Sequence, residues 1–263
     1  YLAFGLATLP QALDLEGVSA LLRALGVSND RNSIRARRAA CRHGSERSVA
    51  ERTDPSRRRC DFCCAELPSA EFERLSDGRE RCSRCRGSAV DTLQSAEDAL
   101  RAAETFLRRD LGLKLRRNIH TRLVDTTELQ RAVGRRFLPT ANYDARAVGV
   151  AIRDGEMCHV LLENGLPYHL ALGTMAHELT HVWQYDNLDT DAMQAHSGLL
   201  LIEGHATWTE LECLRSQNLA PSYCATEAAR SDLYGRGYRQ ILELLAPLPG
   251  RNPFSVLAGR FPR

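Results

Sequence analysis

The stretch that decides the fold is Thr174-Met-Ala-His177-Glu178-Leu-Thr-His181-Val-Trp183-Gln184. The apolar residues in and just before it recur at the spacing of a helix rather than of a strand: Leu170, Leu172, Met175, Leu179 and Val182. On a helix, His177 and His181 lie one turn apart on the same face, so both imidazoles can bind one Zn²⁺. Glu178, beside the first ligand, stays free to take a proton from water. The stretch predicts a helix with a catalytic zinc site. The alternative is a surface helix that carries two histidines by chance.

A zinc site in a hydrolase needs a third protein ligand, and Leu199-Leu-Leu-Ile-Glu203-Gly204-His205 provides candidates. An apolar run that breaks at one glutamate and continues with glycine suits a buried carboxylate on a closely packed second helix. We assign Glu203 as the third ligand. His205 lies two positions further on and points to a different side of the helix. The alternative is a helix that passes from core to surface at Glu203.

A second set of metal ligands lies upstream, in two Cys-x-x-Cys pairs formed by Cys60, Cys63, Cys82 and Cys85. Four thiolates at this spacing can bind one structural Zn²⁺, and the Asp77-Gly78 turn brings the two pairs together. A disulfide framework is disfavoured, because the chain has 9 cysteines and the others are scattered. We treat Cys64 as a bystander. A thiolate zinc site favours a reducing, cytoplasmic location.

Length and composition set the domain organisation. With 263 residues, 43% of them hydrophobic, the chain can bury one core and carry a small accessory module. The formal charge of +2 indicates no acidic partner for the chain as a whole. We predict four regions: an N-terminal helical segment over 1–27, a basic flexible linker over 28–58, a zinc-ribbon module over 59–90 and a zinc metallopeptidase domain over 91–263.

The linker is rich in arginine but has no aromatic residues interleaved for base stacking, so we expect no specific nucleic-acid partner. The apolar start, Tyr1 to Leu9, is too short to span a bilayer. Because the chain begins at Tyr1 rather than at methionine, we treat it as a fragment or processed form and leave its membrane association open.

The remaining elements follow from capping and turn signals. A helix is expected from Asp91 to near Gly112, with Ser95 as N-cap and Asp98 at the reciprocal position. We further expect a strand over 120–124, a helix over 126–133 and a hairpin of strands 147–152 and 157–162, joined by Arg153-Asp154-Gly155. The strand just before the histidine helix should line the site, where its edge can pair with an extended peptide.

Several stretches together are similar to a known family: Leu161 to Pro167, Leu172 to Trp183, Glu203-Gly204, Leu75 to Cys85, Ala89 to Thr92 and Asp232 to Arg239. In their order along the chain, these stretches resemble the LIM region and peptidase domain of the plant LIM-domain, ubiquitin-activated growth-regulating peptidases, the DA-one family. The resemblance covers about residues 59 to 243. A complete LIM domain has two zinc knuckles, whereas only one four-cysteine set is present here.

The resemblance implies an α+β fold, with a mainly helical, gluzincin-type zincin domain, a small antiparallel sheet and a preceding half-LIM zinc ribbon. It implies His177, His181 and Glu203 as zinc ligands, Glu178 as catalytic base, and protein or peptide substrates. It also implies a regulatory protein that binds the zinc ribbon. For the donor to the oxyanion it favours Tyr234 over Tyr238.

Two functions compete. The first is a zinc endopeptidase with one catalytic and one structural zinc. The alternative is a zinc-ribbon interaction scaffold whose metallopeptidase domain is weakly active or inactive. The intact Glu178 favours the first, because a scaffold needs no base beside its ligands. Thr207 and Asp189 are the candidates for orienting the ligand histidines.

Overall fold

The computed structural model describes residues 57–63, 65–133, 147–154, 156–190, 192–193, 199–219, 234–248 and 250–263. The predicted helical segment over 1–27 lies outside these residues, as does the linker up to residue 56. Arg57 and Arg58, which the prediction places in the linker, belong to the first strand, β1 (Arg57–Arg59). No helix in the described part of the chain is long and apolar enough to cross a membrane.

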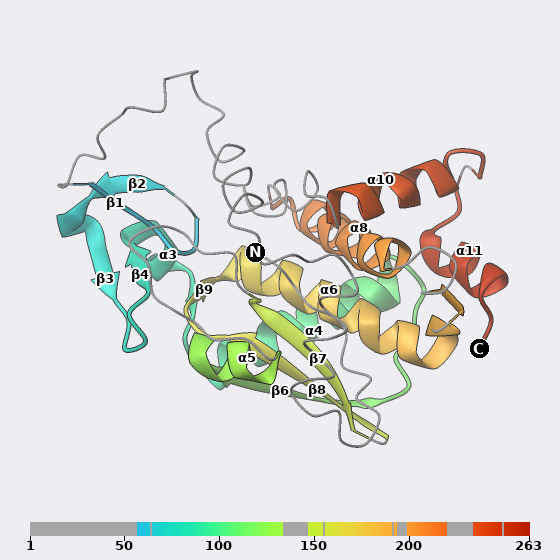
Figure 1. Cartoon of the computed structure of the whole chain (residues 1–263), viewed down its shortest axis with the longest axis horizontal. Helices are drawn as coiled ribbons and strands as arrows, with labels where there is room; N and C mark the ends of the chain where they lie inside the picture. The colour runs from blue at the N-terminus through green and yellow to red at the C-terminus, as the bar shows by residue number, and fades with distance from the viewer. Residues whose placement is uncertain are drawn as a thin grey trace.

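The histidine-bearing helix, α6 (Tyr168–Asn187), runs through the centre of the molecule (Figure 1). Every residue from Leu170 to Tyr185 is buried, so α6 is enclosed on all sides rather than on one stripe. It packs against α4 (Leu93–Arg109) and α8 (Leu200–Ser216), and α8 in turn packs against α10 (Tyr234–Leu245). A last helix, α11 (Pro253–Arg260), follows α10. The surface-helix alternative for this stretch is wrong.

The largest sheet covers another side of α6, in the order β6-β8-β7, from β6 (Asn118–Val124), β7 (Gly149–Asp154) and β8 (Met157–Glu163). The predicted hairpin is confirmed, because β7 and β8 pair antiparallel with Asp154 opposite Met157. The predicted helix after β6 is also present as α5 (Thr126–Ala132). The α+β class is confirmed. The sheet is nevertheless mixed, because β6 runs parallel to β8.

The predicted position of the site-lining strand needs a correction. The hairpin strand nearer to α6 in sequence, β8, is the middle strand of its sheet, and both of its edges are paired. The edge strand that packs beside α6 is β7. Sequence order does not reveal this, because the parallel partner β6 comes from much earlier in the chain and occupies the other edge of β8.

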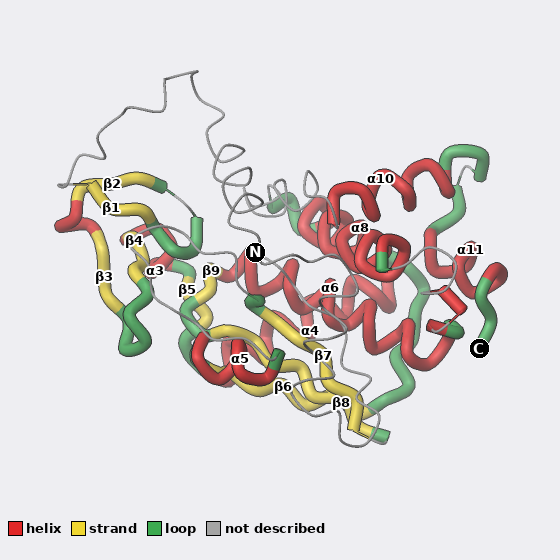
Figure 2. The backbone as a smooth tube through the Cα atoms, viewed as in Figure 1, coloured by secondary structure: helices red, strands yellow, loops and turns green. Residues whose placement is uncertain are grey.

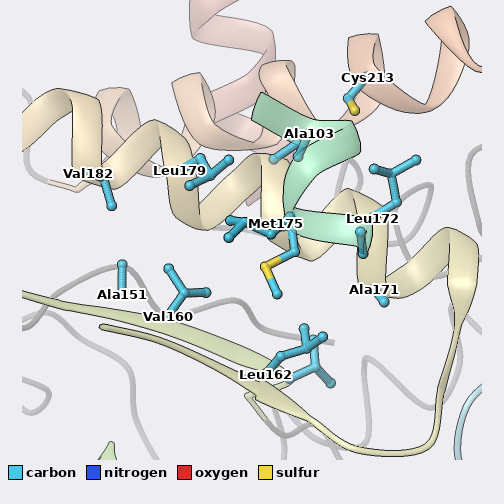
Figure 3. Packing of buried hydrophobic residues seen from close by; sticks show 14 of the residues in the cluster. Ala103, Ala151, Val160, Leu162, Ala171, Leu172, Met175, Leu179, Val182 and Cys213 are labelled. Atoms are coloured by element: carbon cyan, nitrogen blue, oxygen red, sulfur yellow. The ribbon is translucent and has the colours of Figure 1, made fainter. Parts of the chain in front are cut away.

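The main core lies between α6 and this sheet. Figure 3 shows Met175 of α6 pointing toward Val160 and Leu162 of β8, with Ala103 of α4 on the side of α6 away from that strand. All four side chains have no exposed surface. This packing holds α6 rigidly against the sheet, so the positions of its polar residues are set by the apolar ones.

The start of α4 differs from the prediction. Thr92, not Ser95, is the N-cap, and Ser95 takes the reciprocal position of the capping box. The Ser95 amide donates to the Thr92 hydroxyl at 3.1 Å, and the Thr92 amide donates to the Ser95 hydroxyl at 3.2 Å. Asp98 instead accepts from Gln94 at 3.3 Å. The N-cap therefore lies three residues before the predicted one, because the pair of hydroxyls satisfies both amides.

The cysteine module consists of two small antiparallel hairpins and a short helix (Figure 2). Its elements are β1, β2 (Glu66–Pro68), the 3-10 turn η1 (Ser69–Glu71), β3 (Phe72–Arg74), β4 (Glu80–Cys82) and α3 (Ser83–Gly87). The predicted Asp77-Gly78 turn joins β3 to β4, and Gly78 has a φ of 89°, which only glycine adopts freely.

The module joins the rest of the molecule at the start of α6. Its chain continues into β5 (Ala89–Val90), which pairs antiparallel with β9 (Leu166–Pro167), the two residues before α6. The Tyr168 amide, at the first position of α6, donates to the Ser88 carbonyl at 2.7 Å. The end of the cysteine module thus supplies an acceptor for the unsatisfied N-terminus of the helix.

Candidate metal centres

Two groups of metal-ligating side chains stand out in the described part of the chain, and each is a group that the sequence predicts. The first consists of His177 and His181 of α6 and Glu203 of α8. Their ligand atoms all lie within 4.8 Å of one another. Glu203 Oε2 lies 3.3 Å from His177 Nε2 and 3.7 Å from His181 Nε2. Glu203 is buried, so the alternative in which α8 emerges at the surface there is wrong.

This group fits a metal ion in two respects. The Nε2 atom of His181 is buried and has no hydrogen-bond partner in the described part of the chain, which is costly without a ligand. The charges also favour a cation. Burial alone lowers the pKa of His177, but Glu203 and Glu210 outweigh it and raise that pKa to about 10. The three residues could therefore hold a metal ion, which would take the place of the proton on His177.

Glu178 lies between α6 and the edge strand β7. Its Oε2 accepts a hydrogen bond from the Ala151 amide at 2.8 Å, and no room is left for a side chain at Gly149, where a Cβ would overlap Thr174. Burial raises the pKa of Glu178 to about 7, against the opposing charge of His177. The Ala151 carbonyl accepts from Tyr185 at 3.4 Å. Both main-chain groups of Ala151 thus bond to α6, so a peptide pairing there has to displace these side chains.

Tyr234, the predicted oxyanion donor, is the first residue of α10 and is 1% exposed. Its ring centroid lies 6.0 Å from that of His177. Tyr238 instead contacts α8, where its hydroxyl accepts from Arg215 at 3.4 Å. The structure therefore brings Tyr234, and not Tyr238, beside the histidine and carboxylate group.

Two glycines allow this approach. A Cβ at Gly204, the residue after Glu203, would overlap the main-chain carbonyl of Gly237 on α10. A Cβ at Gly237 would overlap the Leu200 carbonyl in the same way. The close packing that the Glu203-Gly204 pair predicts is confirmed, and α10 is the partner helix.

Two further residues beside the histidines, Glu210 and Gln184, are not predicted from the sequence. Glu210 Oε2 lies 3.5 Å from His177 Nδ1, at ion-pair distance. Gln184 Oε1 lies 2.8 Å from His181 Nδ1. Helical spacing alone places each of them on the same face as a candidate ligand. Glu210 follows Glu203 by about two helical turns, and Gln184 follows His181 by about one.

The residues expected in this orienting role, Thr207 and Asp189, make no hydrogen bond to the ligand histidines in the described part of the chain. The Thr207 hydroxyl is buried without a hydrogen-bond partner in the described part of the chain. Asp189 accepts from the Ala192 amide at 2.9 Å. His205 is not among the clustered ligands. It is fully buried, and burial lowers its pKa to about 3, so its ring is neutral.

The second group consists of the four predicted cysteines: Cys60 and Cys63 in the loop between β1 and β2, Cys82 at the end of β4, and Cys85 in α3. The Sγ atoms of Cys60 and Cys85 are 3.8 Å apart, and those of Cys63 and Cys82 are 3.7 Å apart. Hydrogen bonds from neighbouring thiols lower the pKa of Cys60 and raise that of Cys63 to about 12. The four sulfurs could hold one metal ion. Four sulfur ligands would leave no position on a tetrahedral ion for water or substrate. Cys64 lies outside the described residues.

Searches of protein-family models, curated proteins and solved structures find no match to this chain.

Proposed function

We propose that the chain is a zinc-dependent peptidase of the gluzincin type, which hydrolyses peptide bonds in proteins or peptides. The observation that carries the proposal is the cluster of His177, His181 and Glu203, with Glu178 buried beside it on the same helix. Two imidazoles and one carboxylate are a ligand set of catalytic zinc, which keeps a fourth position open. The resemblance to LIM-domain peptidases supports the same function.

The chemistry assigns a separate role to each residue. When bound, zinc supplies a Lewis acid that polarises a peptide carbonyl and makes a water molecule more acidic. Glu178 removes the proton from the attacking water and passes it to the leaving amine. A carboxylate whose pKa is raised to about 7 by burial is a stronger base than one in solvent. Tyr234 is the proposed donor to the oxyanion that develops on the carbonyl.

We assign the four cysteines to a structural zinc ion. Four sulfur ligands satisfy a tetrahedral Zn²⁺ completely, so this ion stabilises the module and does no chemistry. The position of the module at the start of α6 gives it a role in the stability of the histidine helix.

The test compares the wild type with Glu178→Gln on casein and on a peptide library, with the metal content of both measured. Glutamine has nearly the same shape but cannot accept the proton. We expect cleavage by the wild type, loss of at least about 100-fold in the variant, and equal zinc in both. Equal cleavage by the two proteins contradicts the proposal. So does the absence of cleavage by a fully zinc-loaded wild type.

A further inference from the structure

We propose that Gln184 is a positioning residue that determines which nitrogen of the His181 ring faces the metal. The inference rests on the proposed metal site of the peptidase, but not on its activity. Gln184 is 1% exposed and lies on α6, between His181 and helix α8. Its side-chain amide has one oxygen that only accepts and one nitrogen that only donates, so its partners determine how it is turned.

The Ile202 carbonyl determines the orientation of this amide. Gln184 Nε2 lies 3.0 Å from the Ile202 carbonyl oxygen, which can only accept a hydrogen bond. The nitrogen of the amide must therefore face Ile202. A flipped amide would place two oxygens against each other in a buried site, which costs about 1–3 kcal/mol for each unsatisfied group.

A second contact holds the same orientation. Gln184 Nε2 also lies 3.1 Å from Nδ1 of His205. The His205 ring makes edge contacts with Trp183 and Phe254, at centroid distances of 5.9 and 4.1 Å. With both amide hydrogens directed to α8, Gln184 can present only its oxygen to His181.

The tautomer of His181 follows from this orientation. Gln184 Oε1 lies 2.8 Å from His181 Nδ1, so that nitrogen must carry the hydrogen and donate it. Nε2 is then left with a lone pair, and this is the nitrogen that lies 3.7 Å from Glu203 Oε2. Hydrogen bonds of this kind orient ligand imidazoles and increase their basicity. A main-chain carbonyl of α8 thus determines the ligand nitrogen on α6, next to the carboxylate that α8 also contributes.

Two substitutions distinguish this role from a purely structural one, in which Gln184 is only a buried link between α6 and α8. A purely structural role predicts that both substitutions weaken zinc binding to a similar degree. Gln184→Glu keeps an oxygen opposite His181 Nδ1 but removes both donors toward α8. Gln184→Leu removes the acceptor as well as the donors. Thr209→Val is the matched control, because its buried hydroxyl donates to the His205 carbonyl at 3.0 Å and contacts no ligand.

The measurement is the zinc affinity of the histidine site, in competition with a chromophoric chelator, together with the Co²⁺ absorption spectrum. We expect Gln184→Leu to weaken zinc binding by about 10–100-fold and to alter the Co²⁺ spectrum. We expect Gln184→Glu to bind zinc clearly more tightly than Gln184→Leu, because carboxylates are common partners of ligand histidines. We expect Thr209→Val to stay within about threefold of the wild type. A Leu variant that binds zinc as tightly as the wild type overturns the inference. So does a Glu variant as weak as Leu.

A second measurement needs no variant to fold. Nitrogen-15 NMR of the wild-type histidine rings, recorded without metal, distinguishes the two neutral tautomers. We expect His181 to carry its hydrogen on Nδ1, and a hydrogen on Nε2 overturns the inference. These readouts are separate from cleavage. A protein that shows the expected tautomer and affinities but cleaves no peptide contradicts the proposed function and leaves the role of Gln184 intact.

Discussion

Arg79 of the cysteine module and Glu163 at the end of β8 form an ion pair at 2.6 Å, and neither side chain is exposed. Arg79 also pairs with Asp77 at 2.7 Å and donates to the Asn164 carbonyl at 2.8 Å. Its guanidinium lies 5.2 Å from the centre of the Phe62 ring. The module is therefore joined to the central sheet through a buried charge, in addition to the pairing of β5 with β9.

The first prediction concerns this buried arginine. Arg79→Met removes a buried cation that pairs with two buried carboxylates, Asp77 and Glu163, so we expect the free energy of unfolding to fall by about 3–5 kcal/mol. The measurement is urea unfolding at neutral pH. Arg101→Met is the control, because Arg101 pairs with Asp98 at the surface and is 55% exposed. The control should cost less than about 1 kcal/mol, and equal losses in the two variants contradict the prediction.

The second prediction concerns acid stability. Burial raises the pKa of Asp77, but hydrogen bonds and the charge of Arg79 outweigh it and hold that pKa below its ordinary value of 3.8. A lowered pKa in the folded state stabilises the fold above the unfolded pKa, and this contribution is lost as the pH falls through the folded pKa.

We therefore expect wild type to exceed Asp77→Asn in free energy of unfolding by a constant amount above about pH 5, and by less below about pH 4. Urea unfolding of both proteins across this range provides the measurement. Any loss of metal in acid affects both proteins and cancels in the difference. A difference that does not change with pH contradicts the prediction.

The third prediction concerns metal content. We expect about two zinc ions per purified chain, one for each group of ligands. Cys82→Ser should lose about one, and His181→Ala should lose about one from the other site. Elemental analysis at known protein concentration checks both. A native content of one ion contradicts either the cysteine site or the histidine site. A single substitution that removes both ions contradicts their independence.

The fourth prediction concerns Glu210, whose carboxylate lies 3.5 Å from His177 Nδ1. Glu210→Ala removes this partner, and we expect zinc affinity and peptide cleavage to fall by about tenfold or more. Glu210→Gln keeps an oxygen in place and should have a smaller effect. Glu212→Gln is the control on the same helix, because Glu212 pairs with Arg215 and no ligand. Equal effects of Glu210→Ala and the control contradict the prediction.

The fifth prediction concerns Gly204. Gly204→Ala pushes α10 away from α8, because the new Cβ overlaps the Gly237 carbonyl, and it displaces Tyr234 at the start of α10. We expect a loss of about 1–3 kcal/mol in stability and a clear drop in cleavage. Gly259→Ala is the control, since nothing lies within 4 Å of its added Cβ. In helix α11 that change should stabilise by up to about 1 kcal/mol. Destabilisation by both variants to the same degree contradicts the prediction.

The sequence by itself determined the features that depend on local spacing. His177 and His181 share one face because a helix repeats about every 3.6 residues. The Cys-x-x-Cys pairs and the Asp77-Gly78 turn are equally local, and both occur where the sequence predicts them. Glu203 does not follow from the spacing of the histidines. It is still indicated by a local pattern, an apolar run interrupted by one carboxylate beside glycine.

Only the tertiary structure decided which residues support these groups. Glu210 meets His177, and Gln184 meets Ile202, because of the way α6 and α8 cross, and no spacing within either helix specifies that crossing. The edge position of β7 depends on β6, which comes much earlier in the chain and pairs with the other side of β8. The candidate ligands are therefore visible in the sequence. Their orientation becomes visible only when the elements are packed, because contacts between elements depend on packing of the whole core.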